Sequence, residues 1–141
     1  MISTELVERA RPALDVALPR ALGATLIDAE DPTAGVRFRV GDLGATPFGT
    51  LHAAALAAIV ELAGYLVVLP TLEASEHAVT HAISTQYLRP ARAGEQVEVV
   101  AALDKRARTL AFVSVVSTVH AADDARVVAR TQITKTIVGV S

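Results

Sequence analysis

One carboxylate, Glu61, lies in the middle of an otherwise apolar, helix-forming run that spans residues 49–64. An ionised carboxylate costs several kcal/mol to bury without partners, so its presence in such a run needs a reason. A carboxylate held in a water-poor place is a candidate general base. A glycine turn at Gly49 and a histidine, His52, precede it at the entrance of the run.

His52 precedes Glu61 by nine residues, which is about half a turn around an ideal helix. The two side chains are therefore not expected to touch within one chain. His52 falls instead in the first helical turn, where backbone N–H groups have no helical partner. Those amides, especially near Ala53, would polarise a substrate carbonyl with the help of the helix dipole. The commoner role of such a histidine is to cap or brace the turn.

Several classes of chemistry are excluded by composition. The chain has no cysteine, which excludes disulfides, thiolate metal sites and cysteine nucleophiles. His77 and His81 share one face of a strand but have no third ligand, so we expect neither a metal nor a cofactor. A net charge of −2 gives no reason to expect nucleic acid or an anionic membrane as partner. Residues 1–20 lack the apolar core of a signal peptide, so a cytoplasmic protein is expected.

The structure of the run 51–69 determines where Glu61 lies. It is long enough to span a membrane, but it is mostly Ala, and a central Glu would cost roughly 3 kcal/mol there. A buried core helix is the better interpretation. One face of this helix carries bulk and should press on a sheet: Leu51, Ala55, Ile59, Leu62, Leu66 and Leu69. A second face is small except for the carboxylate: Ala54, Ala57, Ala58, Glu61 and Gly64. Glu61 is thus expected at a boundary, beside open space or another chain.

The remaining pattern predicts strands around this helix. We expect an amphipathic helix from Thr4 to about Val16, capped by Ser3 or Thr4 and followed by Pro19. Alternation and turn residues predict strands at 24–29, 35–40, 77–88, 95–103, 109–120 and 126–138. This order fits one α+β domain over residues 1–141, with a curled antiparallel sheet wrapped around a buried helix. The 52% hydrophobic content favours an oligomer.

These residues resemble a known family. Gly49-Thr50-Leu51-His52, Glu61 and the segments 85–91 and 108–112 are similar to the hotdog-fold acyl-CoA thioesterases. The nearest branch is the phenylacetic-acid-pathway (PaaI-like) type, whose motif is Asn-x-x-Gly-x-x-His-Gly-Gly with an acid nine residues after the His. The resemblance runs from about residue 44 to 138. It implies a hotdog fold and a homodimer, or a homotetramer built from two dimers, with the active site at the interface.

Position by position, the resemblance assigns the family's acid to Glu61, as general base or nucleophile. The backbone N–H of Ala53 takes the role of oxyanion donor, and His52 matches the family's histidine. Thr46 stands where the family has an Asn that orients water, and Thr80 supplies a strand hydroxyl that helps hold it. Thr80 is expected to reach the site from the partner chain. The chain departs from the motif at Thr46 and at Ala53-Ala54, which replace Asn and Gly-Gly.

The function that the resemblance implies is hydrolysis of an acyl-CoA thioester. The basic residues expected near the coenzyme A phosphates are Arg89, Arg92, Arg106 and Arg108, although basic hairpins also serve solubility. One alternative is a non-catalytic hotdog protein that binds an acyl-CoA or acyl group, which the altered motif favours. Another is a hotdog dehydratase or hydratase that pairs a histidine such as His81 with an acid. It ranks lower because the chain lacks a proline-rich loop ahead of the helix.

Overall fold

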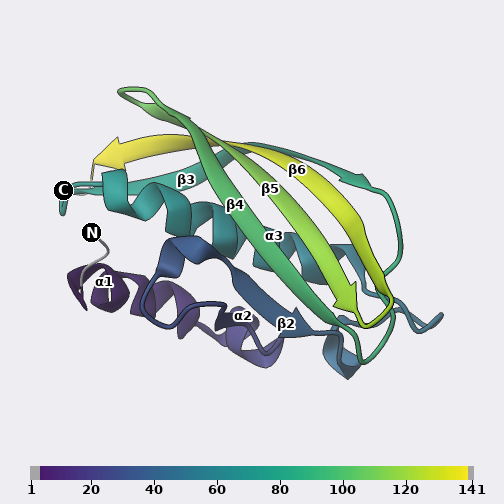
Figure 1. Cartoon of the computed structure of the whole chain (residues 1–141). Coiled ribbons are helices and arrows are strands. Elements are labelled where there is room, and N and C mark those ends of the chain that lie inside the picture. The colour runs from purple at the N-terminus through teal and green to yellow at the C-terminus, as the bar shows by residue number, and fades with distance from the viewer. Residues whose placement is uncertain (1–3, 140–141) are drawn as a thin grey trace.

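A long helix, α3 (Ala53–Val68), lies inside a curled antiparallel sheet in the computed structural model, which describes residues 4–139 (Figure 1). The strand order is β1-β2-β4-β5-β6-β3. The strand bounds are β1 (Thr25–Leu26), β2 (Val36–Arg39), β3 (Glu76–Tyr87), β4 (Gln96–Arg106), β5 (Leu110–Ala121) and β6 (Asp124–Gly139). The predicted α+β hotdog architecture is confirmed, and the strands fall close to the predicted positions.

The bulky face of α3 makes the core. Its members Ile59, Leu62 and Leu66 are buried against the sheet, as predicted. The helix gives way at Leu69 to a 3-10 turn (Leu69–Thr71) that contains Pro70, since proline cannot continue a helical hydrogen-bond ladder. The span Ala53–Thr71 is long and apolar enough to cross a membrane, yet 61% of its apolar 18-residue window is buried inside the fold. The prediction of a core helix is therefore confirmed by its position.

Two amino-terminal helices, α1 (Thr4–Leu14) and α2 (Ala17–Ala21), pack against α3. They lie below α3 in Figure 1, with β5 and β6 above it. The Arg9 guanidinium fastens α1 by donating to the carbonyls of Leu69 and Leu72, at 3.3 and 2.8 Å. The prediction of one helix reaching Val16 is wrong: the chain turns after Leu14, and Pro19 lies inside α2. Proline is tolerated there because the first turn needs no N–H donor. The proposed cap Ser3 lies outside the described residues.

The pairing of β3 with β6 decides which side chains face the helix. Thr80 lies opposite Lys135, and the register shifts between Thr80 and Ala82, so His81 is the extra residue of a bulge. After this bulge Ile83 lies opposite Ile133. β3 ends the strand order, and its outer edge has no strand partner among residues 4–139. An unpaired twelve-residue edge strand is a template for another chain.

Candidate active site

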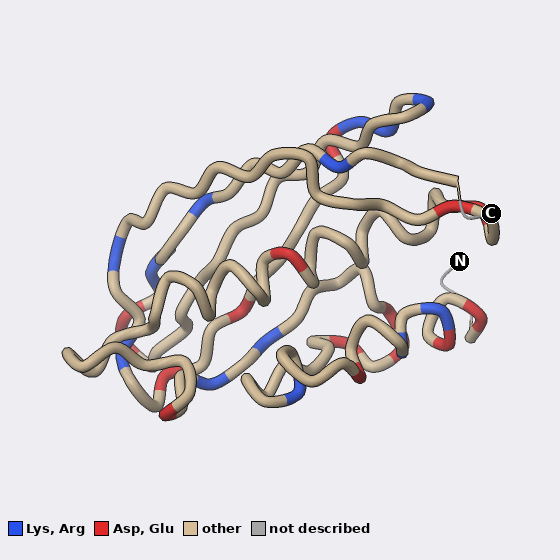
Figure 2. The backbone as a smooth tube through the Cα atoms, turned by 180° about the vertical axis from the view of Figure 1, so that it is seen from behind, with Lys and Arg blue, Asp and Glu red and all other residues tan. Residues whose placement is uncertain are grey.

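Glu61 lies midway along α3 and is the one charged residue of that helix (Figure 2). Its Oε2 accepts a hydrogen bond from the Thr80 hydroxyl. Its Oε1 is buried and has no hydrogen-bond partner within residues 4–139. A buried carboxylate oxygen without a partner is costly, so it marks a site where another molecule or chain completes the bonding. Glu61 therefore presents one fixed oxygen and one free oxygen, which suits a base.

Thr80 reaches Glu61 in a way that corrects the sequence-based expectation. We expected Thr80 of a second chain near the carboxylate, but the Thr80 that donates to Glu61 belongs to the same chain. The reason is the register: Thr80 precedes the bulge of β3 and shares the inward face with Lys135 across β6. A one-residue shift would have turned Thr80 to the opposite face of the sheet.

A pocket of about 440 Å³ opens beside Glu61. The helices α1 and α2 supply its outer wall with apolar side chains, and α3, β3 and β6 supply the rest. The lining residues are Ala13, Val16, Pro19, Ala58, Glu61, Leu62, Tyr65, Ala78, Thr80 and Lys135. Its volume and mostly apolar lining, with a few convergent polar groups, are typical of a small-molecule site.

Lys135 belongs to this pocket and was missed from the sequence. It is 2% exposed, and its Nζ donates to the Thr80 hydroxyl at 3.1 Å. Burial lowers the pKa of the Lys135 ammonium, while the charge of Glu61 partly opposes this shift. The signal was available in β6, where Ile133, Lys135 and Ile137 occupy alternate positions of one face. A lysine at a core position of such a pattern predicts a buried cation.

The amino terminus of α3 holds the second set of predicted residues. His52 is the N-cap of the helix, with φ −69° and ψ 132°, and its Nδ1 accepts from the Ala54 N–H at 3.1 Å. This geometry assigns the ring proton to Nε2. His52 thus braces the first turn of α3 by accepting from the Ala54 N–H. Glu61 accepts from the Thr80 hydroxyl instead, so the two side chains have different partners. The two side chains serve different ends of the site.

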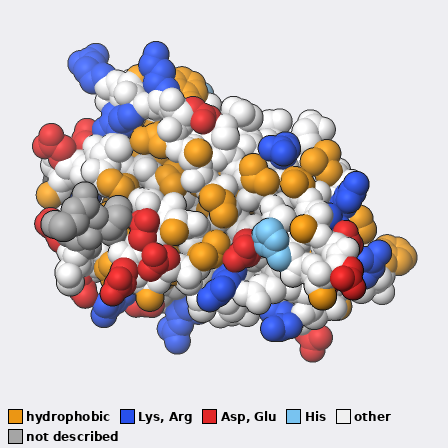
Figure 3. All heavy atoms as spheres, viewed as in Figure 1, with side chains coloured by type: hydrophobic (Ala, Val, Ile, Leu, Met, Phe, Trp, Pro, Cys, Tyr) orange, Lys and Arg blue, Asp and Glu red, His pale blue; other side chains and the backbone are white. Residues whose placement is uncertain are grey.

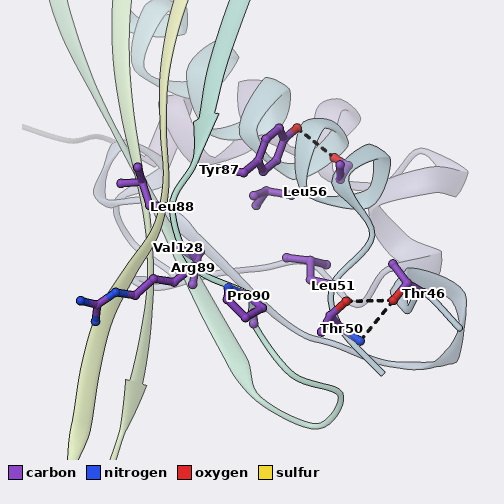
Figure 4. A pocket seen from close by; sticks show the side chains of 11 residues that line it. Thr46, Thr50, Leu51, Leu56, Tyr87, Leu88, Arg89, Pro90 and Val128 are labelled. Atoms are coloured by element: carbon purple, nitrogen blue, oxygen red, sulfur yellow. Dashed lines mark hydrogen bonds between the residues drawn. The ribbon is translucent and has the colours of Figure 1, made fainter. Parts of the chain in front are cut away.

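Ala53 lines a second pocket, of about 390 Å³, at this amino terminus (Figure 4). Its N–H has no acceptor within the part of the chain that the structure describes. The Tyr87 hydroxyl approaches the Ala53 carbonyl at 3.5 Å, from the end of β3. The other lining residues are Thr46, Thr50, Leu51, Leu56, Leu88, Arg89, Pro90, Ala91 and Val128. A free amide at a helix amino terminus is a donor that an oxyanion can use.

Thr46 lies at the rim of this second pocket, and its hydroxyl braces the preceding loop. Its Oγ1 is 2.8 Å from the Thr50 Oγ1 and accepts from the Thr50 N–H at 3.4 Å (Figure 4). It also accepts from the Phe48 N–H at 3.2 Å. The Thr46 N–H also donates to the Thr50 carbonyl, at 2.7 Å. These contacts close the turn that carries Gly49, whose φ of 76° favours glycine.

The two pockets lie at different places along α3. Ala53 and Glu61 are eight residues apart, about 12 Å along the helix axis. No residue lines both pockets, and each is formed by its own set of strand residues. One chain therefore does not place Ala53 and Glu61 around the same reacting carbonyl.

The four arginines do not form one phosphate site within a chain. Arg89 lines the Ala53 pocket, but its guanidinium points away from it (Figure 4), and Arg92 is exposed nearby, where its backbone bridges to Thr50. Arg106 lies at the opposite end of α3 and binds the Thr71 hydroxyl and the Glu76 carboxylate. Arg108 is exposed in the hairpin between β4 and β5. Figure 3 shows Lys and Arg side chains gathered at the tip of this hairpin. The four arginines expected to share one phosphate site are thus divided between the two ends of α3.

His81 does not pair with the carboxylate as a dehydratase would require. Its Nδ1 is 3.0 Å from the hydroxyl of Thr136, which faces the side of the sheet opposite to Lys135. Glu61 lies on the inner side. No group of three or more His, Cys, Asp or Glu residues within residues 4–139 has a metal-binding arrangement.

Comparison with known proteins agrees with this architecture. The sequence profile of the family described as the thioesterase superfamily matches residues 48–128. A search of curated proteins gave no match. Among solved structures, a thioesterase family protein from Silicibacter pomeroyi superposes with a TM-score of 0.84 at 18% identity, over 95% of this chain and 98% of that one.

Two further structures share the fold. The phenylacetic acid degradation protein PaaI from Thermus thermophilus, solved as a mutant, has a TM-score of 0.70 at 24% identity, over 83% and 95% of the two chains. A protein from Streptococcus mutans, solved bound to acetyl CoA, has a TM-score of 0.66 at 23% identity, over 74% and 80%. At these identities the likeness establishes the fold.

Proposed function

The chain belongs to the thioesterase superfamily, and from this premise we propose that it hydrolyses acyl-CoA thioesters with Glu61 as the catalytic carboxylate. The observation that carries the proposal is the state of that carboxylate. Oε2 is held by Thr80, and Oε1 is buried without a partner beside a pocket. A carboxylate so placed has one oxygen available to water or to a thioester carbon.

Two routes use this free oxygen. As a general base, Glu61 takes a proton from a water molecule while that water attacks the thioester carbon, and the thiolate of coenzyme A leaves. As a nucleophile, Oε1 attacks the carbon itself, the thiolate leaves, and water then hydrolyses the mixed anhydride. In both routes Thr80 fixes the carboxylate by hydrogen bonding to Oε2.

The developing oxyanion requires a donor that Glu61 cannot supply. We assign this role to the Ala53 N–H, which lies at the positive end of the α3 dipole. Because Ala53 and Glu61 of one chain are too far apart to share a carbonyl, the site combines Ala53 of one protomer with Glu61 of its partner. The unpaired edge of β3, with Val79, Ile83 and Tyr87 exposed, is the surface on which the second copy pairs.

Coenzyme A as the thiol component is supported by the acetyl CoA bound to the Streptococcus mutans protein of the same fold. In this chain Arg89 lines the Ala53 pocket with its guanidinium turned outward, and Arg92 pairs through its backbone with Thr50 of the same lining. We assign to these two arginines the phosphates of coenzyme A that remain outside the pocket. Arg108 would have to come from another chain. A cytoplasmic location fits a coenzyme A thioester as substrate.

The first test is thiol release from a panel of short, long and aromatic acyl-CoA thioesters. Wild type is expected to turn over at least one of them, and Glu61→Gln, which keeps the side-chain shape but not the base, is expected to lose about 10²–10⁴-fold in kcat. Circular dichroism and light scattering establish that the variant keeps its fold and oligomeric state. Equal turnover by the two proteins would exclude Glu61 as the catalytic group.

The second test asks whether the site is shared between protomers. Ala53→Pro removes the proposed oxyanion donor, and the substitution suits the structure because proline is favoured at the first helical position. His52 already has the extended conformation that a residue before proline adopts. Each variant alone, Ala53→Pro or Glu61→Gln, should be inactive as a homodimer.

Mixing the two variants then separates the possibilities. A mixed dimer with a shared site has one intact site, from Ala53 of one chain and Glu61 of the other. Random mixing should recover about a quarter of wild-type activity, since half of the dimers are mixed and each has one of two sites intact. A site confined to one chain would give no recovery.

A specific observation favours a second candidate, a non-catalytic protein that binds an acyl-CoA. The Thr46 hydroxyl, at the position of the family's Asn, is occupied by Thr50 and the Phe48 amide rather than directed at a ligand. Calorimetry with the same acyl-CoA panel distinguishes the two functions. Tight binding without thiol release from any member would favour the binding protein.

A further inference from the structure

One buried cation near Glu61 is not explained by the proposed chemistry. The sequence contains two lysines. Lys105 lies exposed near the β4–β5 hairpin tip, whereas Lys135 is 2% exposed on the inner face of β6. Burying an ammonium costs several kcal/mol unless it is paired and fully hydrogen-bonded. Its one hydrogen-bond partner within residues 4–139 is the Thr80 hydroxyl.

The direction of the hydrogen bonds follows from the groups. An ammonium only donates and an ionised carboxylate only accepts. Thr80 has one hydroxyl proton, which goes to Glu61 Oε2, so its oxygen accepts from Lys135 Nζ. Ammonium, hydroxyl and carboxylate thus form a continuous chain with every dipole aligned, an arrangement in which the bonds polarise and strengthen one another.

The fold makes room for this chain at Gly64. A Cβ at this position would lie 2.8 Å from the Ile133 Cδ1 and 3.7 Å from the Lys135 Cε. The glycine, three residues after Glu61 on α3, therefore lets β6 approach the helix closely enough for the lysine stem to pass over it. The register that sets Lys135 opposite Thr80 completes the placement.

We propose that Lys135 is a positioning residue, which acts through Thr80 to hold Oε2 of Glu61 in place and to keep its Oε1 free for the reacting molecule. The proposal rests on the proposed function of Glu61 for its effect on turnover. Because Thr80 occupies Oε2, the other oxygen remains available. Burial lowers the pKa of the Lys135 ammonium, and the charge of the neighbouring Glu61 opposes this shift.

Few other groups can produce this effect. The titratable side chains that line the pocket are Glu61 and Tyr65 of α3 and Lys135 of β6. The amino-terminal segment contributes the apolar residues Ala13 of α1, Pro19 of α2 and, between the two helices, Val16. From β3 the pocket receives Ala78 and Thr80, while His81 bonds Thr136 on the opposite face of the sheet. In β5 the residue opposite Lys135 is Ala111. The positive charge that faces Glu61 is thus that of Lys135.

The test compares Lys135→Met, which keeps the stem and removes the charge, with Lys105→Met as the matched control at the exposed lysine. The first readout is the crystal structure of each variant. In Lys135→Met the Thr80 hydroxyl loses its donor, so the Glu61 carboxylate should no longer be held in one orientation. Lys105→Met should keep the Thr80–Glu61 hydrogen bond.

The second readout is the split between kcat and KM. Lys135→Met should lower kcat about tenfold with KM retained, because the carboxylate is less well positioned while the pocket is unchanged. Thr80→Val should lower kcat in the same way because the link is broken. Thr80→Ser, which keeps the hydroxyl, should restore the wild-type kcat.

The outcomes separate this proposal from the proposed function. A Glu61 carboxylate that keeps its orientation in Lys135→Met, or a Thr80→Ser kcat like that of Thr80→Val, overturns the role of Lys135. If wild type hydrolyses no thioester, the proposed function fails, but the variant structures still decide whether Lys135 positions Glu61. If Lys135→Met does not fold, the Thr80→Val and Thr80→Ser pair, examined by the same structures and kinetics, gives the answer.

Discussion

Two buried cations lie toward opposite ends of β6, and their surroundings differ. Arg126 is 6% exposed and uses all three guanidinium nitrogens, which donate to Asp124, Glu95 and the Pro90 carbonyl. Lys135 is 2% exposed and donates to one hydroxyl. Hydrogen bonding to Glu95 raises the pKa of Arg126, whereas burial lowers the pKa of Lys135.

The difference teaches which charge serves structure and which serves chemistry. A fully paired buried cation joins segments of the fold, and Arg126 joins β6 to the loop before β4. A cation with few partners costs stability, and proteins retain such groups where function requires them. Lys135 is the less satisfied of the two cations and lines the pocket of Glu61, which agrees with the positioning role that we propose for it.

The largest expected effect is a difference in kcat between variants of Glu61, near Lys135, and of Glu95, which binds Arg126. Glu61→Gln should lower kcat by about 10²–10⁴-fold, because it removes the proposed base. Glu95→Gln, the same substitution beside Arg126, should leave kcat unchanged and lower Tm, because it removes an acceptor from a buried guanidinium. Steady-state thiol release and thermal unfolding measure both. A comparable loss of kcat in the two variants would break the comparison.

The next effect is on stability, and it has opposite signs at the two cations. Arg126→Met should lower Tm, since it leaves two carboxylates and a carbonyl without their donor. Lys135→Met should raise Tm by roughly a few degrees, because burial opposes the ammonium more than Glu61 favours it. Differential scanning calorimetry at neutral pH gives both values. Destabilisation by Lys135→Met would mean that this lysine is structural.

The dependence of stability on acidic pH should reflect Glu95, the carboxylate that binds Arg126. The backbone N–H of Arg92, followed by the Arg126 side chain, lowers the pKa of Glu95 from its ordinary value of 4.5. A carboxylate with a lowered pKa stabilises the fold above 4.5 and loses that contribution as the pH falls through its folded-state pKa. Denaturant unfolding from pH 7 to 3 should therefore show wild type converging with Glu95→Gln. A constant difference across this range would contradict the assignment.

The dependence of stability on alkaline pH should reflect Lys135. The folded-state pKa of Lys135 lies below the ordinary 10.5, so the unfolded chain binds more protons between the two values. Wild-type stability should then rise with pH in that interval relative to Lys135→Met, because the buried lysine loses a charge that destabilises the fold. Urea unfolding of the pair at alkaline pH measures the difference, and a difference that does not change with pH would contradict the lowered pKa of Lys135.

The smallest effect is expected at Lys105, which contacts neither the Arg126 cluster nor the pocket of Glu61. Lys105 is exposed, and surface substitutions of this kind change stability by about 0.5 kcal/mol or less. Lys105→Met should leave Tm close to that of wild type. The same calorimetry provides the baseline against which the opposite shifts of Arg126→Met and Lys135→Met are judged.

Most of the fold was predictable because it follows from local patterns. The apolar period of residues 51–69 predicts α3, and alternation with turn residues predicts β3 to β6 within a few positions. The boundaries failed where local signals compete. The predicted strand 95–103 ends too early, because β4 continues to Arg106, where it pairs with β5 and Arg106 is held by Thr71 and Glu76.

The candidate site was predictable in its parts but not in its assembly. Glu61, Ala53 and His52 follow from the helix alone, and the structure places each where helical geometry requires. Thr80 was assigned to the wrong chain, and Lys135 was not identified. Both depend on how β3 aligns with β6, and a bulge at His81 sets that alignment. Local sequence preference does not determine such a register between strands distant in the chain.

The sequence by itself determined that a carboxylate is located midway along an apolar helix, with an amide-rich turn at its entrance. Those features follow from residue type and helical period, which act over a few residues. Only the tertiary structure decided that Thr80 occupies one oxygen of Glu61 and that a buried lysine stands behind it. The physical reason is that hydrogen bonds between distant strands and burial by the surrounding helices are properties of the packed chain.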